Sequence, residues 1–171
     1  MKNGRLIALS ALTSAFGLVF IVFGAYFSSL DLSCLFMASV AIMFPLSKDS
    51  VKGAFLSYMA VTLLSLILVG GKFYITILYA VFFGLHPIVN YYQLKKGKSI
   101  SWLTIVKGIW FIITLALMVY LFKLFTIDNL ILDKYLPYAV VIGGAIFFIF
   151  YEFVMLRIQK TTKVLINRLK F

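Results

Sequence analysis

The chain has 171 residues, of which 64% are hydrophobic and 12% are charged. Soluble domains are about half apolar and about a quarter charged, so this chain has too few polar residues to cover the surface of a small soluble protein. One cysteine, Cys34, excludes a disulfide framework, and 11 glycines and 3 prolines exclude a collagen-like chain. The remaining class is an all-α polytopic membrane protein.

Long apolar stretches separated by polar breaks predict a single domain of six transmembrane helices. About 20 apolar residues are needed to cross roughly 30 Å of hydrocarbon. The expected spans are residues 5–27, 30–46, 51–69, 73–93, 100–127 and 135–156, and residues 157–171 form a basic, amphipathic tail. Pro87 lies inside the fourth span, where it is expected to bend the helix and free a backbone carbonyl.

Lysine and arginine residues are distributed unevenly between the predicted loops. The two chain ends and the loops after the second and fourth spans carry twelve of them, whereas the other loops carry only Lys72 and Lys134. By the positive-inside rule, both termini are expected in the cytoplasm, with the chain in the plasma membrane of a bacterial cell. We then expect the cations behind the net charge of +11 to interact with anionic lipid on the cytoplasmic face rather than with nucleic acid. The tail is expected to be either an amphipathic helix on that face or a simple topogenic anchor.

Motifs for catalysis or metal binding are not found in the sequence. His86 is the single histidine, and four of the five carboxylates, all except Glu152, lie at loop edges. No phosphate-binding glycine loop and no serine-hydrolase motif occurs. We therefore expect no enzyme activity, no cofactor and no metal, and we expect Cys34 to be a buried small residue.

Ionisable residues inside a span are costly, which makes each of them a functional candidate. Lys107 in the fifth span and Glu152 in the sixth lie at similar depths. We expect either that they pair, with help from His86 or Asn90, or that each reaches separately to the membrane surface. Lys123 lies near the outer end of the fifth span, where its charge can reach water.

A stripe of polar residues follows one face of the fourth span. It comprises Lys72, Tyr79, His86 and Asn90, which stay within about 40° of one another on an α-helix. The fifth and sixth spans carry similar stripes that include Trp110 and Tyr138. The stripes predict either a polar cavity among the last three spans or hydrogen bonds between the helices of a bundle.

The first span carries small residues on one face near its inner end, at Ala8, Ala11 and Ala15. Small residues allow another helix to approach closely in a membrane. This face is expected either to receive a partner protein or to pack within the same bundle.

The short chain, the six spans, the cytoplasmic ends and Ala11-x-x-x-Ala15 resemble the substrate-binding S components of energy-coupling-factor (ECF) vitamin transporters. The resemblance covers the whole chain in topology, and at residue level it rests on Ala11 and Ala15, extended by Ala8. The segment 82–89 and the tail from Glu152 to Arg168 are also similar to those of S-component-like membrane proteins.

This resemblance implies a function and a set of partners. S components capture a vitamin or similar micronutrient between their outer loops and spans four to six, and they dock through span one on a membrane coupling subunit that two cytoplasmic ATPases drive. Ala8, Ala11 and Ala15 would form the docking face. The implied pocket candidates are Lys72, Tyr79, Trp110, Lys123 and Tyr138, to which the polar stripe adds His86 and Asn90.

Other classes of protein stay open. The chain could be a non-transporting scaffold of similar fold, like the cell-shape protein MreD, although the mid-sequence intramembrane acid expected in MreD is missing. It could be a stand-alone carrier or an accessory subunit of a membrane complex. An intramembrane enzyme would have to rely on His86, Glu152 and Lys107 alone.

Overall fold

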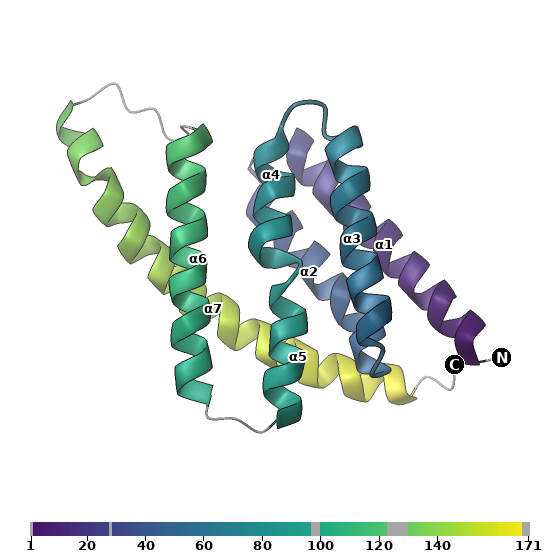
Figure 1. Cartoon of the computed structure of the whole chain (residues 1–171). Coiled ribbons are helices and arrows are strands. Elements are labelled where there is room, and N and C mark those ends of the chain that lie inside the picture. The colour runs from purple at the N-terminus through teal and green to yellow at the C-terminus, as the bar shows by residue number, and fades with distance from the viewer. Residues whose placement is uncertain (1, 28, 97–99, 123–129, 169–171) are drawn as a thin grey trace.

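The computed structural model describes residues 2–27, 29–96, 100–122 and 130–168, and every regular element in these ranges is a helix (Figure 1). The helices are α1 (Lys2–Tyr26), α2 (Asp31–Ser47), α3 (Val51–Leu68), α4 (Phe73–Leu78), α5 (His86–Lys96), α6 (Ile100–Phe122) and α7 (Leu130–Arg168). Within the described residues, five helical stretches are long and apolar enough to cross a membrane, and α2 is a shorter apolar helix. The all-α class expected from composition is therefore confirmed, and the long apolar helices are compatible with a polytopic membrane protein.

The helices form one bundle with α2 at its centre. Helix α2 packs against α1, α3, α5 and α7, and α6 packs against α7. The start of α1, the α2–α3 turn, the end of α5 and the end of α7 all lie at the same end of the bundle (Figure 1). The start of α1 and the end of α7 thus lie at the same end, as they would in a protein with an even number of crossings.

Helix α1 packs on the bundle through glycines. A Cβ atom at Gly24 would lie 2.8 Å from both Cys34 Cβ and Ile75 Cδ1, and one at Gly17 would lie 2.9 Å from Val61 Cγ2. The backbone of α1 therefore comes close to α2, α3 and α4 on this face. The face with Ala8, Ala11 and Ala15 points elsewhere, and these three residues are exposed.

The fourth span is interrupted before its proline. Residues Tyr79–Phe83 form a π-helical turn, in which Gly84 N donates to Tyr79 O at 2.7 Å, and α5 begins afresh at His86. Pro87 thus lies in the first turn of α5. Proline, which has no backbone N–H, is tolerated there because the first N–H groups of a helix have no partner inside it. The carbonyl of Phe83, at the end of the π-helical turn, accepts a hydrogen bond from the hydroxyl of Ser39 on α2.

Near the end of the chain, the helix boundaries differ from the limits of the predicted spans. Helix α6 ends at Phe122, and the rest of the predicted fifth span, 123–127, lies outside the described residues. The sixth span was expected to end at residue 156, before a separate tail, but α7 runs without a break from Leu130 to Arg168. No glycine or proline follows residue 144, so nothing local stops the helix. At about 1.5 Å per residue it exceeds the hydrocarbon thickness, and it crosses the bundle obliquely (Figure 1).

Candidate functional site: a buried charged cluster between α5, α6 and α7

Three ionisable side chains from three helices meet inside the bundle. His86 of α5, Lys107 of α6 and Glu152 of α7 are 0%, 2% and 4% exposed. His86 Nε2 lies 2.7 Å from Glu152 Oε2, and Lys107 Nζ donates to Glu152 Oε1. Of the two arrangements considered for Lys107 and Glu152, the structure therefore has the ion pair.

Two amide side chains complete the environment of the ammonium group. Lys107 Nζ lies 2.6 Å from Asn90 Oδ1 and 2.8 Å from Gln93 Oε1. With Glu152 Oε1, these atoms give one acceptor for each of the three donors that a lysine ammonium carries. The buried charge is thus fully hydrogen-bonded, which is the condition under which an ion pair persists in a low-dielectric interior.

The hydrogen-bond pattern indicates the charge state of the cluster. Asn90 Oδ1 faces Lys107, so its Nδ2 faces His86 Nδ1, at 3.5 Å. Nδ1 is then an acceptor, and the imidazole proton is on Nε2, which donates to Glu152. This assignment gives a neutral His86 beside one ammonium and one carboxylate. The cluster as a whole carries no net charge, which lowers the cost of keeping it inside a membrane.

Aromatic rings enclose the cluster on the side of the π-helical turn. The ring centroids of Phe82, Phe148 and Tyr151 lie 5.1, 6.4 and 4.9 Å from that of His86. The Tyr151 hydroxyl lies 3.2 Å from Ser39 Oγ. The rings pack against His86, and Ser39 connects this aromatic shell to α2.

Several buried polar atoms in the described part of the chain have no protein partner. They include Gln93 Nε2 and Gln159 Oε1 near the cluster, and the hydroxyls of Thr76 and Tyr79 on α4 and the π-helical turn. Tyr79 is 0% exposed. An unpaired buried hydroxyl or amide costs free energy, so these are positions where a water or a polar group of a ligand would form a missing hydrogen bond.

The predicted substrate-binding residues are only partly brought together. Tyr79, His86 and Asn90 are buried, and the latter two belong to the charged cluster. Lys72 is exposed beyond the start of α4, with its Nζ 5.9 Å from the ring centroid of Tyr26. The predicted stripe requires one continuous α-helix from Lys72 to Asn90. Lys72 instead precedes α4, and the π-helical turn changes the angle around the helix axis between residues before it and residues after it.

The candidates on the later helices are also separated. Trp110 is half-buried, with its ring centroid 5.0 Å from that of Phe82. Tyr138 is 66% exposed on α7, so the polar stripe predicted for the sixth span does not bring it to the cluster. Lys123 lies outside the described residues.

Sequence analysis missed Gln93 as a member of the cluster. It follows His86 by seven residues and Asn90 by three, so all three lie on one face of α5. Extending the polar stripe by one more turn would have found it. The contact of Gln159 Nε2 with the Pro87 carbonyl, at 3.1 Å, had no comparable signal because residues 157–171 were expected to form a separate tail.

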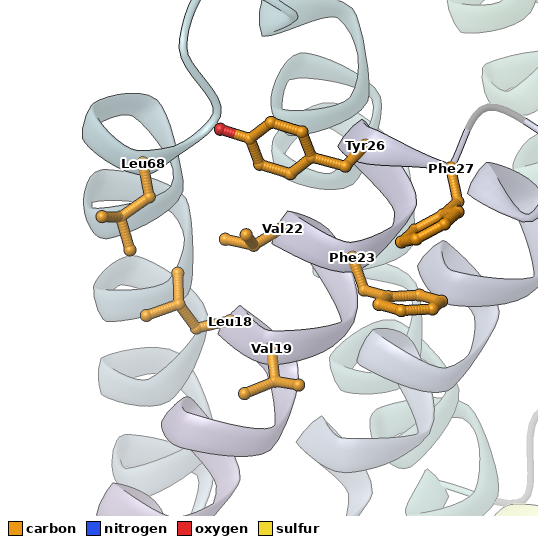
Figure 2. A pocket seen from close by; sticks show the side chains of 7 residues that line it. All are labelled: Leu18, Val19, Val22, Phe23, Tyr26, Phe27 and Leu68. Atoms are coloured by element: carbon orange, nitrogen blue, oxygen red, sulfur yellow. The ribbon is translucent and has the colours of Figure 1, made fainter.

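The exposed face of α1 continues from its alanines into an open apolar groove. Figure 2 shows the groove, which is lined by Leu18, Val19, Val22, Phe23, Tyr26, Phe27 and Leu68. Leu18 follows Ala15 by three residues, and Val22 follows Leu18 by four, so the three residues lie on one side of the helix. A single stripe therefore runs along α1, with small residues in its first half and a groove in its second.

Comparison with family models, with curated proteins and with solved structures gives no match to this chain. In the described part of the chain, no group of three or more histidine, cysteine, aspartate or glutamate side chains is arranged to hold a metal ion.

Proposed function

We propose that the chain is the substrate-capturing membrane subunit of a multi-subunit importer of the ECF type. It lies in a bacterial plasma membrane with both termini in the cytoplasm. Its substrate is a vitamin or a similar micronutrient, and its partners are a membrane coupling subunit and two cytoplasmic ATPases. The observation that carries the proposal is the exposed face of α1 formed by Ala8, Ala11 and Ala15.

This face suits a partner helix because α1 does not need it for its own packing. Gly17 and Gly24 make the close approach within the bundle. In a membrane, where lipid is as apolar as leucine, helices associate where small residues let their backbones come close. Two small-residue faces on one helix therefore favour one contact within the chain and one with a partner.

Unpaired polar atoms support a role in substrate capture. The hydroxyls of Tyr79 and Thr76 are buried and lack a protein partner. A small molecule with hydrogen-bonding groups would satisfy them on binding, which would favour binding of that molecule over a purely apolar one. Tyr79 is thus the substrate-binding candidate that the proposal ranks first.

The test introduces bulk on the docking face. The variant Ala11→Trp/Ala15→Trp should lose co-purification with the coupling subunit, because the partner backbone could no longer approach α1. Ala116→Trp is the matched control, since Ala116 is an exposed alanine on α6. The control should keep the complex. Equal recovery of the complex from the docking variant and the control would contradict the proposal.

A non-transporting scaffold is the second candidate function. It is favoured by the polar stripe, whose members His86 and Asn90 bond to neighbouring helices rather than lining an open space. A scaffold of the MreD type would associate with proteins of cell-wall elongation and not with ATPases. The proteins that co-purify with the chain distinguish the two candidates.

A further inference from the structure

One end of the bundle carries a strong excess of positive charge. This basic end is formed by the start of α1, the α2–α3 turn, the end of α5 and the end of α7 (Figure 1). Its exposed cations are Arg5, Lys52, Lys95, Arg157, Lys160 and Lys163. In the described part of the chain, Lys163 is the only one of these six in an ion pair, with Asp49 at 3.4 Å. Most of the charge at the basic end is therefore not neutralised by the chain itself.

The last turns of α7 are held against the basic end by one face. Lys48 Nζ donates to Ile166 O at 2.9 Å, and Gln159 Nε2 donates to Pro87 O at 3.1 Å. Gln159 and Thr162 are buried on this face. These contacts determine which residues of α7 point away from the bundle.

The opposite face of the same turns combines cations with apolar side chains. Arg157 and Lys160 are exposed, and one turn further Val164 and Leu165 are 53% and 55% exposed. The spacings of three and four residues place Arg157, Lys160 and Val164 along one side of the helix, and Leu165 lies at the margin of that side, about 80° from Arg157. A face of this composition is typical of helices that lie in the interface between water and lipid.

We propose that this face of α7, together with the basic end, is a binding site for anionic phospholipid. Arg157 and Lys160 contact the headgroup phosphates, and Val164 and Leu165 enter the upper acyl region. The helix emerges from the apolar stretch without a break, which puts Arg157 at the membrane boundary. Lipid fits better than a soluble acidic protein or a nucleic acid because the exposed apolar pair lies beside the cations.

The experiment measures lipid preference by native mass spectrometry. The full-length protein is reconstituted in nanodiscs with equal amounts of phosphatidylglycerol and phosphatidylcholine, and the retained lipids are counted. The wild type should retain phosphatidylglycerol preferentially, and raising the salt concentration should weaken the preference. Since each cation near the surface favours anionic lipid about fivefold, Arg157→Gln/Lys160→Gln should lower the preference about 25-fold.

Two controls separate charge from other effects. Thr161→Gln adds the same amide to the exposed face without removing a charge, and Arg157→Lys/Lys160→Arg keeps both charges; both variants should keep the preference. Equal retention of the two lipids by the wild type would overturn the proposal, as would an unchanged preference in the double glutamine variant. Binding of a DNA oligonucleotide in neutral nanodiscs without any lipid preference would instead assign the basic end to nucleic acid.

Discussion

Lys107 of α6 and Glu152 of α7 form an ion pair inside the bundle, and each is almost completely buried. The pair joins the two last helices across 45 residues of sequence, and His86 extends it to α5. Because the pair is neutral and hydrogen-bonded, removing one partner should be much more damaging than removing both.

A double-mutant cycle tests this relationship. Lys107→Met leaves a buried carboxylate without its counter-charge and should lower the free energy of unfolding by about 3–5 kcal/mol. Lys107→Met/Glu152→Gln should be less destabilised than the sum of the single variants, with a coupling of about 1–3 kcal/mol. Unfolding by SDS in mixed micelles measures both quantities. Lys72→Met, the same change at an exposed lysine, should be within about 0.5 kcal/mol of wild type.

The hydrogen bond from Ser39 to the Phe83 carbonyl gives a second prediction. Ser39→Ala should cost about 1–3 kcal/mol, because it leaves a buried carbonyl without a donor. Ser33→Ala, the same change at an exposed serine of α2, should be within about 0.5 kcal/mol of wild type. The same unfolding assay measures both variants. Equal effects of the two changes would contradict the role of Ser39.

The close approach of α1 to α2 predicts different effects for two glycine substitutions. Gly24→Ala should destabilise the protein by about 1–3 kcal/mol, because the new Cβ would lie 2.8 Å from Cys34 Cβ, which moves only with the α2 backbone. Gly143→Ala on α7 is the control. Its Cβ meets nothing within 4 Å, and replacing a mid-helix glycine should stabilise by up to about 1 kcal/mol. Equal effects of the two changes would contradict the packing of α1.

The contacts of Asp49 predict a dependence on acid. The hydrogen bond from the Tyr91 hydroxyl, with the charge of Lys163, holds the pKa of Asp49 below its ordinary value of 3.8. A lowered folded-state pKa contributes stability that is complete above the unfolded-state value and is lost as the pH falls through the folded-state value. The stability difference between wild type and Asp49→Asn should therefore be constant at neutral pH and vanish well below pH 4. Unfolding curves of both proteins from pH 7 to pH 2.5 measure it, and a difference that persists at pH 2.5 would contradict this role of Asp49.

Much of the fold could be predicted because hydrophobicity and span length determine it. Composition gave the membrane class, and depth along the spans was enough to suggest the pairing of Lys107 with Glu152. Depth could not show which way each side chain turns, which is why Tyr138 was expected on a polar stripe of the sixth span but is exposed.

The π-helical turn and the long α7 had no clear signal in the sequence. A π-helical turn depends on tertiary contacts, here including the bond from Ser39 to Phe83, and residue spacing alone cannot report it. The end of the sixth span was placed where hydrophobicity falls. A helix, however, continues until a residue such as glycine or proline interrupts its backbone hydrogen bonds. Contacts such as that of Lys48 with Ile166 hold the polar part of α7 against the bundle.

The most direct test of the proposed function is native mass spectrometry of the chain purified in a mild detergent from the cells that produce it. We expect a complex with one membrane coupling subunit and two ATPases, carrying a bound small molecule that ATP turnover releases. Recovery of the chain with cell-wall elongation proteins, or without any ATPase and without a bound molecule, would contradict the proposed function.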